Sequence, residues 1–376
     1  MPEIGEVARL VHYLKKHVAG KVISSVKTQD DTIVYGKAGT SAAAFEQAMK
    51  GKKILDAGQQ GKYFWMTMAS PPHPVMHLGM TGWIDLSTVP TGSYKPKKEG
   101  EQWPPRFWKF ILQLDDKEKT EVAFTDARRL GRIRLVDAPA DKLRQTTPLK
   151  ENGPDPVVDK EIVTVGWFSE KLKKKKVPIK AFLLNQANIS GVGNWVADEV
   201  LYQAKTHPEQ YCNTFSNSQI KTLHDSLISV CSIACETLAD QDKFPKGWLM
   251  LHRWSKGKKG QNVLPNGEKI TFLTVGGRTS AIVPSVQKKT GPVAADVSAN
   301  GEAKAVNGTG SSESKKRRKT EDVEDSEDSE DADEVENSKA KSKRPSKVSK
   351  TNTKSTPKKE TIVTESPRRS SRRSKA

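Results

Sequence analysis

Met1-Pro2-Glu3-Ile4-Gly5-Glu6-Val7 opens the chain, and apolar residues then recur at steps of three and four residues as far as Val18. This spacing predicts one amphipathic helix over residues 3–19, ended by Gly20. Further on the period changes, and runs rich in β-branched and aromatic side chains occupy residues 22–26, 54–68, 75–86, 107–114, 122–125 and 133–136. Helical segments do not alternate with these strands, so residues 1–137 are expected to form an antiparallel β-sandwich capped by the first helix.

The chain beyond residue 137 divides by composition into further parts. Residues 138–158 carry Ala-Pro-Ala and Asn-Gly-Pro-Asp-Pro, which are typical of a linker. Residues 159–241 have a helical period, and residues 242–285 have the character of a hairpin turning at Gly276-Gly277. Within the helical part we expect helices at 160–175, from Pro178, from Asn194 and at 218–238. The fold class is therefore α+β with several domains.

Residues 286–376 are expected to form a disordered charged tail. No Phe, Tyr or Trp follows Phe272, residues 315–319 are Lys-Lys-Arg-Arg-Lys, and residues 321–336 hold 11 acids in 16 positions. Such a segment cannot bury enough apolar surface to offset the entropy of ordering it. The basic cluster is typical of a nuclear-import signal, so we expect the protein in the nucleus.

The charge balance indicates a polyanionic partner. The 376 residues include 63 Lys and Arg against 45 Asp and Glu, a formal charge of +18, which favours nucleic acid over a membrane surface. No run reaches the roughly 18 apolar residues that span a bilayer, and the N-terminus lacks an apolar signal-peptide core, so we expect no membrane partner. The three cysteines, Cys212, Cys231 and Cys235, fit free thiols and exclude both a disulfide framework and a four-cysteine zinc site.

Pro2 is the candidate nucleophile. If Met1 is removed, as expected before a small second residue, Pro2 becomes a secondary amine with a pKa of about 7.7–8.0, against about 10.4 for lysine. Its neutral form could attack an aldehyde-like carbon and give an iminium, which makes the neighbouring C–H acidic. Glu3 and Glu6 lie within one helical turn and could move protons. Proline and acids in a first turn are equally typical of an ordinary helix start.

Separated motifs along residues 1–285 together point to one family. They are Met1–Val7, Gly61-Lys62-Tyr63, His77-Leu78-Gly79-Met80-Thr81-Gly82, Thr125-Asp126-Ala127-Arg128-Arg129-Leu130-Gly131 and Ser190-Gly191-Val192-Gly193-Asn194. In this order they resemble the formamidopyrimidine-DNA glycosylase family, which includes Fpg (MutM) and the related Nei enzymes. The resemblance implies that residues 159–241 form a helix-two-turn-helix DNA-binding domain. Gly5 stands where the family has proline, and Leu130 where the bacterial members have phenylalanine.

The resemblance also implies roles at the damaged nucleotide. Pro2 would attack the sugar C1′ and Glu3 would shuttle protons, whereas Glu6 would support the amine or only the helix start. Lys62, on a predicted strand, would hold the flipped nucleotide and its phosphate, and His77 would contact a phosphate.

Other matched residues would bind the opened duplex. Met80, Arg128 and Leu130 would fill the gap that an everted base leaves, because C1′ is inaccessible inside the stack. Asn194 would grip a phosphate from the start of its helix, which plain N-capping does not contradict.

The C-terminal hairpin departs from the bacterial pattern, in which four cysteines build a zinc finger that carries an arginine. Gly277-Arg278-Thr279 resembles the zincless finger of the plant and fungal branch, with hairpin packing in place of the metal. Arg278 would contact the lesion phosphates and act as a charge sink for δ-elimination. Residues 242–268 are short where bacterial members carry a longer lesion-capping loop. This favours formamidopyrimidines and hydantoins as substrates and puts strong 8-oxoguanine recognition in doubt.

The resemblance thus predicts a bifunctional DNA glycosylase and AP lyase of base excision repair, acting through Pro2 and then by β,δ-elimination. Damaged double-stranded DNA is the expected partner, the protein is expected to be a monomer, and no cofactor or metal is implied. Two alternatives stay open at this point. One is a non-catalytic DNA- or chromatin-binding protein that keeps the fold, and the other is a Nei-like enzyme that prefers oxidised pyrimidines.

Overall fold

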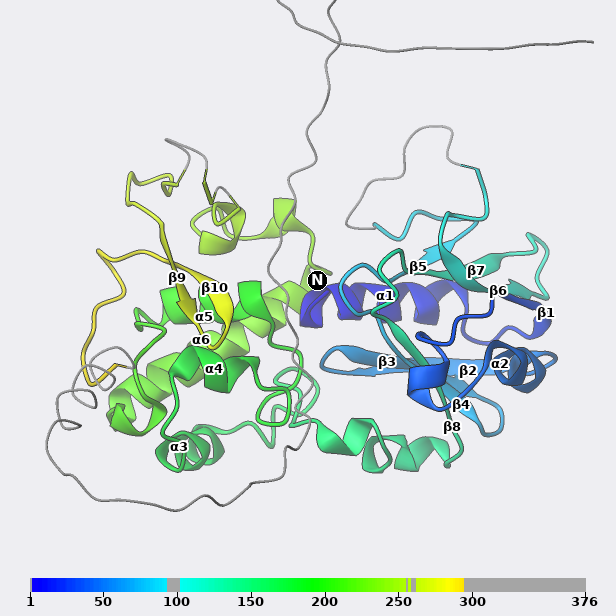
Figure 1. Cartoon of the computed structure of the whole chain (residues 1–376), viewed down its shortest axis with the longest axis horizontal. Coiled ribbons are helices and arrows are strands. Elements are labelled where there is room, and N and C mark those ends of the chain that lie inside the picture. The colour runs from blue at the N-terminus through cyan, green and yellow to red at the C-terminus, as the bar shows by residue number, and fades with distance from the viewer. Residues whose placement is uncertain (1, 93–101, 255, 258–261, 294–376) are drawn as a thin grey trace, which may run out of the picture. The chain divides into compact units, whose positions relative to one another are not determined.

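The computed structural model describes residues 2–92, 102–254, 256–257 and 262–293 (Figure 1). Two four-stranded sheets form its N-terminal part, with the strand orders β1-β6-β7-β5 and β2-β3-β4-β8, and every pairing is antiparallel. The strands are β1 (Ile23–Thr28), β2 (Ile54–Gln60), β3 (Tyr63–Met68), β4 (His73–His77), β5 (Trp83–Leu86), β6 (Trp108–Leu114), β7 (Glu121–Thr125) and β8 (Arg132–Val136). Apolar side chains of both sheets share one core, so the predicted β-sandwich is confirmed.

The first helix, α1 (Ile4–His17), belongs to two cores at once. Its apolar stripe from Val7 to Leu14 packs into the sandwich, because residues three and four apart share one helix face. Its first residue, Ile4, packs instead into the core of the helical part. At Gly5 a Cβ atom would lie 2.8 Å from the carbonyl oxygen of Ala234, so glycine in place of the family's proline lets another helix approach closely.

The helical part follows the predicted order. Its helices are α3 (Val165–Lys173), α4 (Ile179–Leu184), α5 (Asn194–Gln203) and α6 (Asn217–Glu236). Two of them start at hydroxyl caps: Thr164 accepts from the N–H of Trp167, and Ser216 forms a capping box with Gln219. Their apolar faces enclose one core, in which Trp195 is the largest fully buried side chain.

The finger hairpin forms where the sequence placed it. It pairs β9 (Thr271–Val275) with β10 (Arg278–Ile282) across a turn at Gly276 and Gly277, whose φ angles of +59° and +73° suit glycine. A small apolar cluster supports it, made of Leu249, Leu264, Ile270, Ala281 and Val283. No helix within the described ranges has the length and apolar character to cross a bilayer.

Several details differ from the sequence prediction. The run 54–68 is two strands around a tight turn, the run 75–86 is two strands around a loop, and an unpredicted helix, α2 (Ala42–Met49), follows β1. The predicted linker is an ordered segment that buries Leu143, Leu149 and Asp155. Single-turn helices occur at η1 (Gly36–Ala38), η2 (Ala140–Gln145), η3 (Leu149–Glu151), η4 (Cys212–Thr214), η5 (Gln241–Lys243) and η6 (Leu249–Leu251).

The folded part extends beyond the predicted border at residue 285. Gln287 is 2% exposed and donates to the carbonyl of Thr206, and Val293 is fully buried and bridges to Gln210. Because these residues pack against the helical part, the predicted border at residue 285 is wrong, and the fold continues at least as far as Val293. The rest of the predicted tail, residues 294–376, lies outside the described residues.

Candidate functional site

Glu3 joins the start of the chain to the start of α5. Its carboxylate accepts hydrogen bonds from the backbone N–H groups of Gly193, Trp195 and Val196, at 2.9–3.0 Å. These are groups that a helix N-terminus leaves without partners in the helix, and the helix dipole favours an anion there. A Cβ atom on Gly193 would lie 2.2 Å from Cδ of Glu3, so only glycine allows this approach.

Two glycine turns meet beside this carboxylate. Gly61 has φ +58°, and a Cβ atom there would lie 2.5 Å from the backbone nitrogen of Gly191. The N–H of Ile4 donates to the carbonyl of Gly191, and the N–H of Gly61 donates to the buried carboxylate of Asp155. The hairpin turn between β2 and β3, the start of α1 and the turn before α5 therefore pack at one place.

Lys62 lies in this hairpin turn and not within a strand, which corrects the sequence prediction. The cause is Gly61, whose left-handed φ reverses the chain inside the apolar run. The turn places Lys62, which is 9% exposed, next to Gly61, which packs against Gly191, and Gly191 in turn contacts Ile4. Pro2 is itself buried at the start of α1.

Glu6 supports the helix start. Its Oε2 accepts from the backbone N–H of Glu3 at 2.9 Å, which closes a capping box. Burial, and then the nearby charge of Glu3, raise the pKa of Glu6 above its usual value. These contacts show that Glu6 stabilises the start of α1.

His77 ends β4 close to Lys62. Its Nδ1 accepts from the N–H of Gly79 at 3.0 Å, and its ring centroid lies 4.9 Å from that of Tyr63. Burial, with the cations of Lys62 and Arg132 beside it, lowers the pKa of His77 to about 4. The ring is therefore neutral at pH 7, and Nε2 carries the hydrogen that could be donated to a phosphate oxygen.

The loops that carry Met80 and Arg128 are bound together. Asp126, 1% exposed, accepts from the hydroxyl of Thr81 in one loop and from the N–H groups of Arg128 and Gly131 in the other. The loops also touch at Gly79, where a Cβ atom would lie 2.4 Å from the carbonyl carbon of Leu130. Three predicted duplex-opening side chains thus come from two adjoining loops: Met80 and Leu130 are half-buried, and Arg128 is exposed.

Asp31 fixes the same region, and sequence reasoning missed it. Its carboxylate accepts two hydrogen bonds from the guanidinium of Arg129 and one from Nζ of Lys109, all at 2.9–3.0 Å. Burial alone would raise the pKa of Asp31, but the bonds from Arg129, backbone N–H groups and Lys109 hold it well below the usual range. An aspartate in a polar loop gives no sequence signal for such a role.

Asn194 is the first residue of α5, and Gly193 is its N-cap. The Asn194 side-chain amide donates to the carbonyl of Thr279 at 3.0 Å, which ties the helix start to the finger. Arg278, the residue before Thr279, is half-buried at the start of β10. The structure thus brings these two predicted phosphate contacts together.

A buried ionic cluster anchors the finger. Asp198 accepts from the N–H of Ala281 at 2.9 Å and pairs with Lys180 and Arg253. All three charged side chains are less than 10% exposed, and a fully paired cluster of this kind fixes the geometry of the elements that it joins. Among the residues that the structure describes, no group of three or more His, Cys, Asp or Glu side chains could hold a metal.

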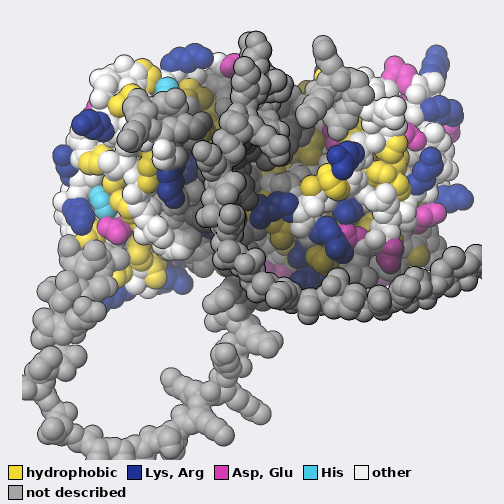
Figure 2. Space-filling view, turned by 45° about the horizontal axis from the view of Figure 1, so that its top comes forward, with side chains coloured by type: hydrophobic (Ala, Val, Ile, Leu, Met, Phe, Trp, Pro, Cys, Tyr) yellow, Lys and Arg dark blue, Asp and Glu magenta, His cyan; other side chains and the backbone are white. Residues whose placement is uncertain are grey.

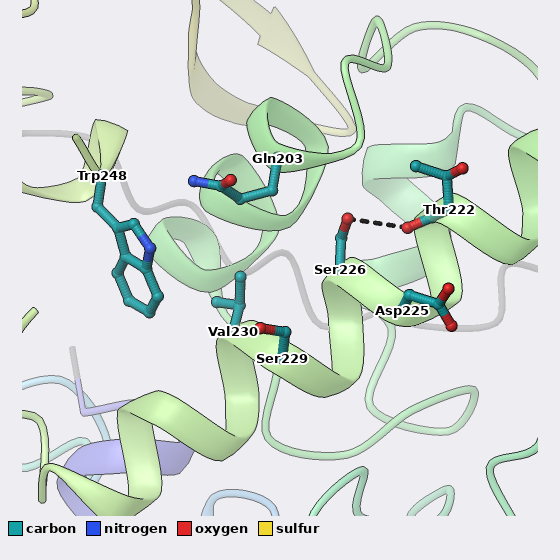
Figure 3. Close-up of a pocket in the computed structure, with 7 residues that line it drawn as sticks. All are labelled: Gln203, Thr222, Asp225, Ser226, Ser229, Val230 and Trp248. Carbon is teal, nitrogen blue, oxygen red and sulfur yellow. Dashed lines mark hydrogen bonds between the residues drawn. The ribbon is translucent and has the colours of Figure 1, made fainter. Parts of the chain in front are cut away.

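The surface also carries clusters of Lys and Arg side chains (Figure 2) and a pocket. Figure 2 shows Lys and Arg side chains in several clusters on the face in view, with apolar side chains between them. A pocket of about 290 Å³ lies among α5, α6 and Trp248 (Figure 3), and none of the residues considered above lines it. Its lining is Gln203, Thr222, Asp225, Ser226, Ser229, Val230 and Trp248.

Comparison with known proteins agrees with this geometry. The profile of the formamidopyrimidine-DNA glycosylase N-terminal domain matches residues 1–133, and that of the H2TH domain of the same family matches residues 153–244. A formamidopyrimidine-DNA glycosylase from Arabidopsis thaliana is 40% identical over 290 residues, which cover 77% of this chain and 71% of the relative. One from Pediococcus pentosaceus is 32% identical over 236 residues, 63% of this chain and 78% of the relative.

Solved structures are similar as well. The glycosylase of Lactococcus lactis, non-covalently bound to DNA that contains an AP site, superimposes with a TM-score of 0.62 at 27% identity, covering 76% of this chain and all of that one. A MutM protein in complex with DNA that contains carbocyclic 8-oxo-G gives 0.61 at 26% identity, covering 77% of this chain and all of that one.

Proposed function

This chain belongs to the formamidopyrimidine-DNA glycosylase family and is a DNA glycosylase of base excision repair, and from this premise we propose that it is bifunctional and cuts the strand through an iminium at Pro2. One observation carries the proposal. The start of α1, the Gly61-Lys62 turn and the turn before α5 lie far apart in sequence and pack against one another around Glu3. The proposed nucleophile Pro2, the proposed cation Lys62 and the proposed acid–base group Glu3 all lie on these segments.

In the first step, a bond from the Pro2 nitrogen to C1′ replaces the bond between C1′ and the damaged base. After Met1 is removed, the Pro2 nitrogen donates its electron pair to C1′, and the C1′–N bond breaks with its pair leaving on the base, which takes up a proton. The amine loses its proton, the C1′–O4′ bond opens, and O4′ is protonated. Glu3 is the proposed carrier of these protons, because it follows Pro2 in the chain and its carboxylate is fixed by the N–H groups at the start of α5.

The iminium then drives elimination. Loss of a C2′ proton breaks the C3′–O bond (β-elimination), and a second proton loss breaks the C5′–O bond (δ-elimination), so that phosphates remain on both sides of the gap. Lys62, His77, Asn194 and Arg278 are proposed to hold the flanking phosphates. Cationic and N–H donors are the groups that stabilise such leaving groups.

The preferred substrates are proposed to be ring-opened formamidopyrimidines and hydantoins. The Lactococcus lactis relative has been solved with DNA that contains Fapy-dG, and a MutM relative with DNA that contains carbocyclic 8-oxo-G. The segment over residues 242–268 is short in this chain, which argues against strong capping of 8-oxoguanine. Part of that segment, residue 255 and residues 258–261, lies outside the described residues.

The proposed setting follows from the charge and the basic runs. Damaged duplex DNA is the partner, the protein acts as a monomer without a cofactor or metal, and residues 315–319 direct it to the nucleus. A fluorescent fusion of the full chain should be nuclear, and a fusion with these five residues changed to alanine should not.

Borohydride trapping on abasic DNA tests the mechanism. We expect a covalent adduct that maps to residue 2, is lost in Pro2→Gly and is kept in Lys37→Ala, which removes an exposed lysine amine. Duplex binding without any adduct would refute the proposed lyase chemistry at Pro2. A mature chain that retains Met1 and still cuts DNA would exclude Pro2 as the nucleophile.

A lesion panel tests the substrate. Formamidopyrimidine should be excised faster than thymine glycol. The reverse order would favour the Nei-like alternative.

A further inference from the structure

Phe107 is an exposed aromatic residue with a strained backbone conformation. Its side chain is 51% exposed, and its φ angle of +62° lies in the left-handed region that bulky residues avoid. The Arg106 guanidinium lies 5.1 Å from the ring centroid. Exposure of the ring and backbone strain both cost free energy, and strain of this kind concentrates at functional sites.

The backbone ties Phe107 to the loop of Arg128. The carbonyl of Phe107 accepts from the N–H of Asp126 at 3.0 Å, and the next residue, Trp108, pairs with Thr125 at the edge of that loop. The carboxylate of Asp126 in turn binds the Met80 loop and the Arg128 loop together, as described above.

A second, ionic tie joins the same segments. Lys109, two residues after Phe107, and Arg129, next to Arg128, share the buried carboxylate of Asp31. Arg129 also has a left-handed φ, of +58°. Phe107 and the Arg128 loop are therefore held in fixed relation by a backbone bond on one side and an ion cluster on the other.

We propose that Phe107 is a further DNA-contacting residue, whose ring stacks on a base unstacked beside the gap that the everted nucleotide leaves. The inference rests on the proposed duplex-opening role of Met80, Arg128 and Leu130. Leu130 supplies an aliphatic wedge where bacterial members have an aromatic ring. Phe107, anchored to the same loop, supplies an aromatic surface, and every base offers a face for such stacking. The Arg106 guanidinium over the ring adds a positive charge beside this surface.

The test compares duplex and single-stranded substrates. Phe107→Asn removes the ring with a residue that tolerates φ +62°, Phe107→Gly does so without strain, and Phe107→Tyr keeps the ring. Leu55→Ala is the matched control, since Leu55 is 50% exposed on the other sheet, about 20 Å along β2 from the Gly61 turn. Each variant is assayed for affinity to a duplex with a tetrahydrofuran abasic analogue and for borohydride trapping on a single-stranded abasic oligonucleotide.

We expect Phe107→Asn and Phe107→Gly to weaken duplex binding about fivefold or more, within the range that one base–aromatic stack contributes. Their single-strand trapping should stay at the wild-type level, and Phe107→Tyr and Leu55→Ala should bind the duplex normally. Unchanged duplex affinity in both ringless variants would overturn the inference, and so would equal losses on both substrates. If the wild-type protein also gave no trapped adduct, the result would refute the Pro2 mechanism and not the inference about Phe107.

Discussion

Replacement of Gly193 by alanine should disable the contact between Glu3 and α5 without straining the backbone. Gly193 has φ −114° and ψ −159°, an extended conformation that alanine adopts freely. The cost therefore comes from the new methyl group, which would lie 2.2 Å from Cδ and 2.4 Å from Oε1 of Glu3. Overpacking costs about 1–3 kcal/mol, and a hydrogen bond to a charged group contributes about 1.5–3 kcal/mol.

The carboxylate must move and weaken at least one of its three bonds, so we expect a total loss of about 2.5–6 kcal/mol. In a protein of this size, at roughly 2 °C per kcal/mol, the melting temperature should fall by about 5–12 °C. Excision should slow by about tenfold or more, because the proposed proton carrier is displaced.

Thermal unfolding and single-turnover excision from a formamidopyrimidine duplex measure the two effects. Gly166→Ala is the control, since a Cβ atom there meets nothing closer than Oγ1 of Thr164 at 3.9 Å, and alanine in α3 should leave stability equal or up to about 1 kcal/mol higher. In a Glu3→Ala background, Gly193→Ala should cost much less, because the clashing group is gone. A Gly193→Ala protein that melts and turns over like the wild type would refute this placement of Glu3.

Three further predictions concern the loops, the histidine and the chain end. Asp126→Ala should slow excision from duplex DNA more than cleavage of single-stranded abasic DNA, because two loops lose their shared acceptor; equal losses would contradict that role. The His77 imidazole should titrate near pH 4 by NMR. Its folded pKa lies below the unfolded value of about 6.5, so the unfolded chain binds more protons and stability falls as the pH drops from about 6.5 to 4. In urea titrations at several pH values, His77→Gln should reduce this loss of stability on acidification. An NMR titration midpoint of the His77 imidazole near pH 6.5 would exclude the effect. Truncation after residue 293 should keep the melting temperature and weaken binding to undamaged duplex at low salt. Truncation after residue 285 should lower the melting temperature, because it removes the buried Gln287 and Val293; equal stability of the two would contradict this.

The elements best predicted from sequence are those with a strong local period. The α1 stripe from Val7 to Leu14 repeats over about two turns, and α6 and the Gly276-Gly277 hairpin carry equally clear signals. The helix α2 was missed because its eight residues, rich in alanine, show too little periodicity. Lys62 was misplaced because a single glycine turn inside an apolar run resembles a strand interior.

The sequence alone determined which chemistry the chain can offer, since an amine behind Met1, neighbouring carboxylates, and glycines at turns are local features. Tertiary structure decided which of them meet. Glu3 and Gly193 are 190 residues apart, Asp31 and Arg129 are 98 apart, and Phe107 joins the Arg128 loop through a backbone bond to Asp126. Local spacing constrains only residues within a few turns of each other. Contacts at such separations exist only after the sheets and helices have packed, so no motif spacing encodes them.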